Sequence, residues 1–341
     1  MAGCSFSIER QMVIIEDRVY GKVEVNEEFL LELMASEPLQ RLKKIDQHGA
    51  RQYIEEFGRV SRYEHCVGVM ILLRKLGASL EEQIAGLLHD VPHTAFSHVI
   101  DWVFSENNHE QDFHEKFFEK IVLNSEIPAV LEKYGFDVNR VINESLFGLL
   151  ERSSPNLCGD RLDYSFRDYI AFMGKDDGRV KRFLKHLIVH NQEIMFNNED
   201  VALEYATHYL WMDKEKWADY RSVASYHYLA KALKLGVDEK VISFDDLFLT
   251  DAEVMQKLKY SKNEVILKNL SYLNPNLKVE LVNKEQADIN SFAKVRFVDP
   301  KILDKDGSLK RVSEYYPELL DKIKIHKERI VDGIYLKVFV E

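Results

Sequence analysis

The sequence has few cysteines, no long apolar run and no excess of positive charge, and each absence excludes a class of protein. Only three of its 341 residues are cysteine. Because a small odd number of cysteines does not describe a disulfide framework, we expect a reducing, cytoplasmic setting. Nowhere do 18 apolar residues follow one another, and the N-terminal segment lacks the apolar stretch of a secretion signal. We therefore expect neither membrane spanning nor secretion.

The net charge limits the classes of partner that the protein can bind. A net charge of −11 argues against nonspecific binding to nucleic acid or to an anionic membrane. An anionic small molecule would instead need a local basic pocket. Cations that could contribute to one are Arg62, Lys181, Arg182, Lys185 and Arg221, although a run such as residues 179–182 more often forms a solvated face.

Periodicity predicts a mainly α-helical protein with a large core, since 46% of the residues are apolar. Residues 12–25 read as two short strands around Tyr20-Gly21, followed by a helix over about 26–35. Helical patterns extend over about 37–174 and 199–235, and a hairpin turning near Asn191 separates them. No repeats or low-complexity tracts appear.

Three segments of chain follow from this pattern. We expect an N-terminal hairpin and helix over residues 1–36, a helical core over 37–238 and a small α/β appendage over 239–341. The appendage has the strand-like runs KVELV, AKVRFVD and GIYLKVFV and a helix or two. The run VEVNEEF (residues 23–29) and the run KVFV (residues 337–340) could pair as neighbouring strands. The appendage would serve subunit contacts or closure of a cleft, or would only stabilise the fold.

Two imidazoles and two carboxylates form the most informative group of side chains. They are His65 in RYEH, the adjacent pair His89-Asp90, and Asp160 in LCGDRLDY. Imidazole accepts Zn, Fe, Mn or Ni, whereas carboxylate favours the harder of these ions, so the mixed set suits a divalent metal. Asp90 would be costly to bury at the end of an apolar helix without a partner. Such a metal could activate water against a phosphate ester.

Capping residues and a proline predict where these residues lie on helices. Ser79 and Glu82 have the form of a capping box that opens the helix ending at His89-Asp90, and Pro92 helps to stop it. Further along, two faces of one helix are expected. Asp160, Tyr164 and Asp168 lie on one, and Leu162, Phe166 and Ile170 on the other. The polar face would line a cleft between helices, where helical proteins build metal sites.

For each candidate residue there is also an ordinary structural interpretation. A single histidine on a helix is more often a core or surface residue than a ligand. We interpret His48, His186, His190, His208 and His227 in that way. Cys66 and Cys158 lie close in sequence to His65 and Asp160, so a thiolate ligand is conceivable, but free cysteine is usually a small buried hydrophobe.

These motifs resemble those of the HD-domain metal-dependent phosphohydrolases, named for an adjacent histidine and aspartate. The similarity is greatest to the deoxynucleotide triphosphohydrolase branch, which includes the vertebrate enzyme that joins a sterile alpha motif to an HD domain. Seven stretches match in order over about residues 12–228. They are IEDRVYGKVEV, EPLQRLKKIDQHG, SRYEHCVGV, AGLLHDVPHTAFSHVID, a His-Glu segment around 109 to 115, LEKYGFD and GDRLDYSFRD. Many relatives have glycine in place of Pro92.

The resemblance implies an HD-domain helical core and one divalent ion, which could be Mn, Fe, Mg, Zn or Ni. Its ligands would be His65, His89, Asp90 and Asp160. His93 matches an active-site histidine that contacts substrate phosphate or donates a proton, and His98 matches a second active-site histidine. The family's catalytic His-Glu pair matches His114-Glu115, favoured because a helix continues from it, or alternatively His109-Glu110.

The resemblance also implies substrate contacts. Gln47 and Arg62 fall on positions that touch the sugar end and the phosphates, and Tyr164 and Asp168 on positions that line the sugar pocket. These motifs do not decide whether the substrate carries a triphosphate. The segment after Trp217 supplies basic and tyrosine side chains in the family, and here Arg221, Tyr226, Tyr228 and Lys231 have no role assigned by motif.

Together these observations predict a metal-dependent phosphohydrolase acting on nucleotides, similar to the deoxynucleotide triphosphohydrolases. The alternatives are a nucleotide 5′-monophosphatase, a phosphodiesterase or other phosphoesterase, and a non-catalytic HD scaffold that senses a nucleotide. The complete set of four ligands favours an enzyme. Relatives form dimers or larger rings, so the resemblance also implies a homo-oligomer.

Overall fold

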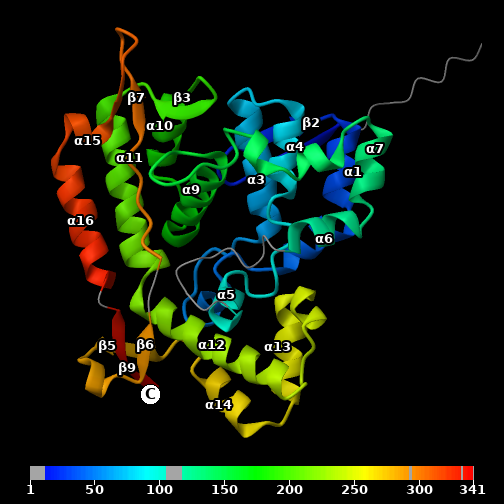
Figure 1. Ribbon diagram of the computed structural model, residues 1–341, viewed down its shortest axis with the longest axis vertical. Helices are drawn as coiled ribbons and strands as arrows, with labels where there is room; N and C mark the ends of the chain where they lie inside the picture. The colour runs from blue at the N-terminus through cyan, green and yellow to red at the C-terminus, as the bar shows by residue number, and fades with distance from the viewer. Residues whose placement is uncertain (1–11, 105–116, 292–293, 332, 341) are drawn as a thin grey trace, which may run out of the picture.

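A computed structural model of the chain describes residues 12–104, 117–291, 294–331 and 333–340, and these are mainly helical, as predicted (Figure 1). Both candidate His-Glu pairs, His109-Glu110 and His114-Glu115, lie outside the described residues. Within these ranges, no helix combines the length and the apolar character that crossing a bilayer would require.

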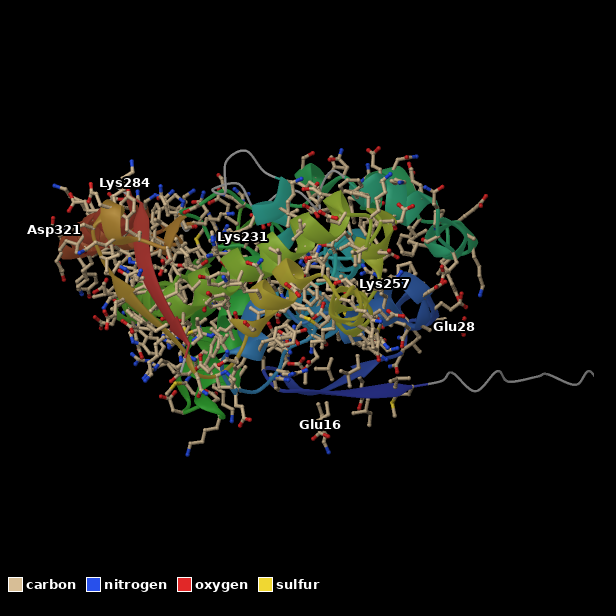
Figure 2. The ribbon with its side chains drawn as sticks, turned by 90° about the horizontal axis from the view of Figure 1, so that it is seen from below. Glu16, Glu28, Lys231, Lys257, Lys284 and Asp321 are labelled. Carbon is tan, nitrogen blue, oxygen red and sulfur yellow. The ribbon has the colours of Figure 1, made fainter. Side chains whose placement is uncertain are left out.

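The N-terminal hairpin forms as predicted. Strands β1 (Val13–Asp17) and β2 (Gly21–Val25) pair antiparallel, and helix α1 (Glu28–Ala35) follows. The Asp17 carboxylate accepts hydrogen bonds from the backbone N–H groups of Val19 and Tyr20, which closes the turn. The hairpin lies along one edge of the molecule, where Glu16 points away from the body (Figure 2).

Short helices follow one another through the first half of the core. They are α2 (Glu37–Arg41), α3 (Arg62–Lys75), α4 (Leu80–Leu88), α5 (Val99–Phe104), α6 (Phe118–Leu123), α7 (Ile127–Lys133), α8 (Val138–Val141) and α9 (Gly159–Met173). Helix α3 packs against α4 and α9 and is buried along most of its length. Gly68 is required there, because a Cβ would collide with the side chains of Asp163 and Arg167.

Helix α9 has the two faces that its sequence predicts. Leu162, Phe166 and Ile170 are buried in the main hydrophobic core, whereas Asp160, Tyr164 and Asp168 line a cavity. The helix ends at Gly174, whose φ of 75° is a left-handed conformation that glycine adopts without strain.

The start of α4 differs from the predicted capping box. The Ser79 hydroxyl accepts a hydrogen bond from the Glu82 backbone N–H, as expected, but the Glu82 side chain does not return to Ser79. It accepts hydrogen bonds from the backbone N–H groups of Leu149 and Leu150, at 2.7 and 3.0 Å. The carbonyl groups of Leu149 and Leu150 in turn accept from Gly159 and Asp160 at the start of α9. Glu82 therefore links α4 to the position of Asp160.

The second half of the core begins with α10 (Arg179–His186) and the hairpin of β3 (Leu187–His190) and β4 (Glu193–Phe196), which turns at Asn191 as predicted. The helices that follow are α11 (Glu199–Met212), a π-helical turn (Asp213–Trp217), α12 (Tyr220–Asp238), α13 (Asp251–Tyr260) and α14 (Glu264–Ser271).

The C-terminal strands join two different sheets. Strands β7 (Lys301–Leu303) and β8 (Leu309–Arg311) extend the β3–β4 hairpin, with β7 parallel to β4. Strand β9 (Ile334–Val340) lies between β5 (Leu277–Leu281) and β6 (Ile289–Ser291). Helices α15 (Val312–Tyr315) and α16 (Glu318–Val331) pack along α11 (Figure 1). The suggested pairing of VEVNEEF with KVFV is thus wrong, because β9 is occupied on both edges.

The strand-like run AKVRFVD is not a strand where the structure describes it, over residues 294–299. Its backbone donors bind groups other than a neighbouring strand. The Arg296 N–H donates to the Asp213 carboxylate and the Asp299 N–H to the Pro155 carbonyl. The segment is a loop that enters the cavity. The three segment boundaries predicted from the sequence stay predictions.

Replacing Glu82 by alanine would leave two buried N–H groups without an acceptor, at a cost of about 1–3 kcal/mol each. We expect Glu82→Ala to lower the free energy of unfolding by about 2–4 kcal/mol, measured by urea denaturation. Glu81→Ala is the matched control, because Glu81 pairs with Arg140 at the surface and its loss should be far smaller. Equal losses in the two variants would contradict the linking role of Glu82.

Candidate active site

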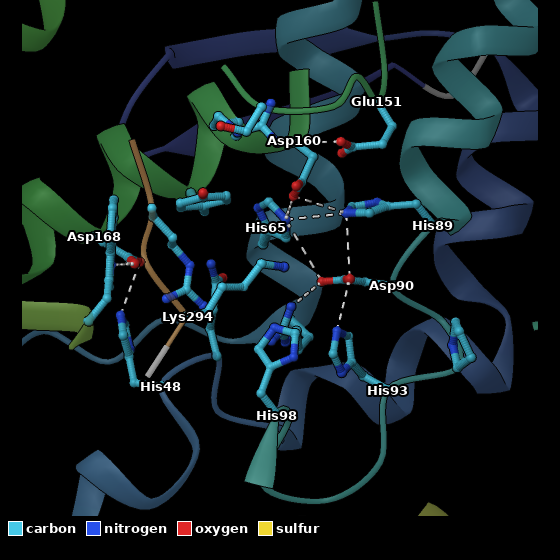
Figure 3. Close-up of a pocket in the computed structure, with 18 of the residues that line it drawn as sticks. His48, His65, His89, Asp90, His93, His98, Glu151, Asp160, Asp168 and Lys294 are labelled. Carbon is cyan, nitrogen blue, oxygen red and sulfur yellow. Dashed lines mark hydrogen bonds and ion pairs between the residues drawn. The ribbon is translucent and has the colours of Figure 1, made fainter. Parts of the chain in front are cut away.

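A cavity of about 900 Å³ contains most of the residues that the sequence singles out (Figure 3). Its walls come from α3, the end of α4, the turn before α5, α9, the π-helical turn, α12 and the loop of residues 294–297. Ten of the twelve predicted site residues lie in the described ranges, and all ten line the cavity: Gln47, Arg62, His65, His89, Asp90, His93, His98, Asp160, Tyr164 and Asp168.

His65 and His89 face each other with their Nε2 atoms 3.2 Å apart. The other nitrogen of each ring has a partner. His65 Nδ1 lies 2.8 Å from the Asp163 carboxylate, and His89 Nδ1 lies 2.8 Å from the Gly86 carbonyl. Because both partners are acceptors, each Nδ1 carries the proton. In the neutral form of each ring, the Nε2 lone pair is directed into the cavity.

Two carboxylates complete the cluster. Asp160 Oδ1 lies 2.9 Å from His65 Nε2 and 3.6 Å from His89 Nε2. Asp90 Oδ1 lies 3.5 Å from His89 Nε2, and its Oδ2 lies 3.8 Å from His65 Nε2. His65, His89 and Asp160, from α3, the end of α4 and α9, therefore lie together as a possible metal site, and Asp90 lies beside them. Such a set matches the nitrogen and oxygen ligands of a divalent transition metal.

The electrostatic potential at this point favours positive charge. Burial by itself would lower the pKa of His89, but Asp90 and Asp160 outweigh it and raise that pKa to about 10. Burial likewise opposes the charge on Asp160, and His65 and His89 still hold its pKa below the usual range. Either bound protons or a metal cation can supply the positive charge that this potential favours. The donor set of two imidazole nitrogens and carboxylate oxygens is one that a divalent metal accepts.

Asp163 holds His65 in place from behind. Its Oδ2 accepts from His65 Nδ1 and from Arg167 Nε, and its Oδ1 accepts from Tyr20 and from Arg167 Nη2. Arg167 is fully buried and also pairs with Asp17 at 3.0 Å. Carboxylates in this position fix the orientation of a metal-binding histidine and increase its basicity. Asp163 was not singled out from the sequence, although it lies three residues after Asp160.

Arg62 borders the cluster on the side of Asp90. Its Nη1 donates to Asp90 Oδ2 at 2.7 Å, and its Nε donates to the Ser97 hydroxyl at 3.0 Å. Ser97 and Phe96 have φ values of 52° and 62°. Such a left-handed conformation costs energy in residues other than glycine and occurs at functional sites. The turn brings His98 into the cavity.

His93 and His98 form an adjacent pair. His93 Nε2 lies 3.2 Å from Asp90 Oδ1, and the two imidazole rings meet edge to face at 4.9 Å. His98 Nδ1 lies 3.1 Å from Asp101. Burial, together with the charges of Arg62, Arg296 and Lys294, holds the pKa of His98 well below its ordinary value. His98 is therefore neutral near pH 7.

Asp251 fastens the loops on this side of the cavity from outside it. Its carboxylate accepts from the backbone N–H groups of Asp46 and Phe96 and from the Gln52 side chain, at 2.7–2.9 Å. Asp251 begins α13, far along the chain from the loops that it holds.

Aromatic and polar groups line the wall beyond the cluster. Asp168 Oδ2 accepts from Trp217 Nε1 at 2.8 Å, and Tyr164 packs edge to face on Trp217. The Tyr164 and Tyr209 hydroxyl groups are in contact. The Gln47 side-chain oxygen is buried and has no hydrogen-bond partner among the described residues. This wall offers both stacking surfaces and polar groups.

His48 is buried, which excludes a position at the surface and agrees with the structural interpretation. It lines the cavity, with Nε2 3.0 Å from Asp168 Oδ1 and Nδ1 3.5 Å from Asp46. Burial opposes its charge, but Asp168 and Asp46 raise its pKa to about 9. The sequence signal was its place directly after Gln47.

Most basic residues that line the cavity differ from the five cations named from the sequence. Of the five suggested cations, only Arg62 lines it. Arg182 pairs with Glu204 at the surface, and Arg221 donates to backbone carbonyl groups. The other cations of the cavity are Arg51, Arg161, Lys216, Lys294 and Arg296. Lys294 and Arg296 come from the run read as a strand.

The two described cysteines, Cys66 and Cys158, are buried. Cys158 lies near Glu151 and Asp160. Burial raises the pKa of its thiol well above the ordinary value, and Arg161 Nη1 donates to its Sγ at 3.0 Å. The histidine and aspartate cluster is thus the better metal site.

The chain resembles known proteins along most of its length. A model of the HD domain matches residues 62–154. The uncharacterized protein YdhJ of Bacillus subtilis (strain 168) is 38% identical over 326 residues, which are 95% of this chain and 98% of that protein. The metal-dependent phosphohydrolase cns2 of Cordyceps militaris is 32% identical over 298 residues, with 85% of each chain covered. This chain belongs to the HD-domain metal-dependent phosphohydrolases.

More distant matches agree with this family. The mouse deoxynucleoside triphosphate triphosphohydrolase SAMHD1 is 24% identical over 292 residues, which are 71% of this chain and 44% of that protein. A solved phosphohydrolase from Bacteroides thetaiotaomicron shares the fold with a TM-score of 0.70, over 96% of this chain and all of its own, at 19% identity. The adjacent residues His89-Asp90 lie within the range that the HD-domain model matches.

The raised pKa of His48 gives a pH prediction for this phosphohydrolase. Its contribution to stability is fully present below the unfolded pKa of about 6.5 and is lost as pH rises through about 9. We expect His48→Gln to cost about 2–3 kcal/mol at pH 6 and much less at pH 9.5, measured by urea unfolding of both proteins. A cost independent of pH would show that His48 is not charged in the folded protein.

Proposed function

We propose that this phosphohydrolase acts on a nucleotide, in the manner of a deoxynucleoside triphosphate triphosphohydrolase. One observation carries the proposal: a histidine and aspartate cluster, several cations and an aromatic wall face the same cavity of about 900 Å³. That volume is within the usual range for sites that enclose small molecules. The name of the mouse relative supports the same substrate class.

The proposed ligands of one divalent metal ion are His65, His89, Asp90 and Asp160. Their support is the convergence of the two Nε2 atoms with oxygen atoms of both carboxylates. When bound, such an ion shields phosphate charge and lowers the pKa of water. The chain contributes the orientation of the rings, through Asp163 and the Gly86 carbonyl.

Arg62, His93 and His98 are proposed to act on the phosphate. Arg62 is held by Asp90 and Ser97, so its guanidinium is oriented before substrate binds and costs little reorganisation when charge develops. His93 shares Asp90 with it and is proposed to contact phosphate or donate a proton. Neutral His98 can donate a hydrogen bond from one ring nitrogen without adding charge.

The aromatic wall is proposed to hold the nucleoside. Tyr164 and Trp217 offer ring surfaces, and the Asp168 carboxylate and the unpartnered Gln47 oxygen can accept hydrogen bonds from sugar hydroxyl groups. The roles of His114-Glu115, the homo-oligomer and the cytoplasmic setting stay predictions from the sequence.

Product analysis tests this function. We expect metal-stripped protein to regain activity with one or more of Mn, Fe, Mg, Zn and Ni, and to release tripolyphosphate from deoxynucleoside triphosphates. The His89→Ala/Asp90→Ala double variant should lose at least about 1,000-fold in kcat/KM, because the metal and its activating effect are lost together. Orthophosphate released from nucleoside monophosphates would instead identify a 5′-monophosphatase, and no turnover of any nucleotide would refute the proposal.

Asp163 should affect metal binding without touching the metal. We expect Asp163→Asn to weaken affinity for Mn or Co about 10–100-fold, measured by calorimetry. Tyr20→Phe is the matched control, since it removes a hydrogen bond to the same carboxylate but leaves the contact with His65. Circular dichroism would verify folding. Unchanged affinity in folded Asp163→Asn would refute the role of His65 as a ligand oriented by this carboxylate.

A further inference from the structure

The loop of residues 294–297 is held against the cavity by one buried carboxylate. Asp213, at the end of α11, has no exposed surface. Its Oδ2 accepts from the Arg296 backbone N–H at 2.9 Å and lies 2.8 Å from His326 Nε2 of α16, while its Oδ1 lies 3.5 Å from Arg296 Nη1. Asp213 is also the first residue of the π-helical turn, whose last residue, Trp217, donates a hydrogen bond to Asp168. The loop is therefore anchored to the wall of the site.

Lys294 differs from the other cations of the cavity in having no partner. Arg62 pairs with Asp90, Arg161 with Glu151 and Arg296 with Asp213. The remaining two, Arg51 and Lys216, both pair with Glu55. Among the residues that the structure describes, Lys294 makes neither an ion pair nor a hydrogen bond. An ammonium group without a counter-ion, inside a cavity, can bind an anion without first breaking a contact.

The position of Lys294 lies between the two halves of the site. Figure 3 shows its side chain extending into the cavity between Asp160 on one side and His98 on the other. Its charge acts on His98, whose pKa it helps to lower, and it is itself attracted by Asp160. The pKa of Lys294 is lowered by burial and by the neighbouring Arg296 and Arg161. An anion bound here would be stabilised by three cations together.

We propose that Lys294 binds phosphate oxygens of the substrate, so that the loop of residues 294–297 completes the active site. This inference rests on the proposed function and names a further binding residue for it. The ligand is an anionic phosphate chain. Lys294 is not a metal ligand, and we expect its loss to weaken substrate binding more than the chemical step.

Calorimetry with inorganic tripolyphosphate on the Mn-loaded protein tests the inference. We expect Lys294→Met to raise Kd about 10-fold, Lys294→Arg to restore most of the affinity, and metal binding to stay unchanged. Lys305→Met is the matched control, since it removes the same charge from an exposed position in the same part of the chain that does not line the cavity. With substrate, KM should rise about 10-fold while kcat changes less than about 3-fold.

The outcomes separate the two proposals. Wild-type protein that binds tripolyphosphate, with Lys294→Met binding it equally well, would overturn the inference and leave the proposed function standing. Equal weakening in Lys305→Met would also overturn it, because the effect would then reflect net charge alone. Wild-type protein that binds neither tripolyphosphate nor orthophosphate would count against the proposed function itself, and the inference would fall with it.

Discussion

The buried carboxylate of Asp163 is the group on which the arrangement of the site depends. It joins the N-terminal hairpin through Tyr20, helix α3 through His65 and its own helix α9 through Arg167. A buried carboxylate is tolerated only when its acceptor positions are filled, and here four donors fill them. The same contacts set the tautomer of His65. The packing of the core and the orientation of the histidine and aspartate cluster therefore depend on one ionic network.

The cavity is built from opposing charges that the fold holds apart. Acceptors converge where His65, His89 and Asp160 meet, and cations stand on the surrounding walls. Asp90 belongs to both sets, since it faces the histidines and also binds Arg62. An acidic protein can in this way hold an anionic substrate, because a local concentration of cations, and not the net charge, sets the potential inside a cavity.

Residues far apart in the chain complete the site through two further buried carboxylates. Asp251 fastens the loops of Asp46 and Phe96 from α13, and Asp213 fastens the loop of Arg296 from the π-helical turn after α11. Each binds backbone N–H groups that no strand or helix satisfies. Loops fixed in this way keep their side chains in position without regular secondary structure. This is how the C-terminal part of the chain contributes Lys294 and Arg296 to a cavity whose core lies in the first half.

The sequence by itself predicted most of the elements and a histidine and aspartate cluster, of which the structure brings His65, His89 and Asp160 together. Hydrophobic spacing located the β1–β2 hairpin, the β3–β4 hairpin and the two faces of α9, because these depend on neighbours in the chain. It also placed His65, His89, Asp90 and Asp160 in one site, since their motifs are local and resemble those of a family. Only the tertiary structure decided the second partner of Glu82, the carboxylates that His48 contacts and the loop at Arg296. Each depends on a contact with a distant segment, and local periodicity carries no information about which distant donor or acceptor a side chain will meet.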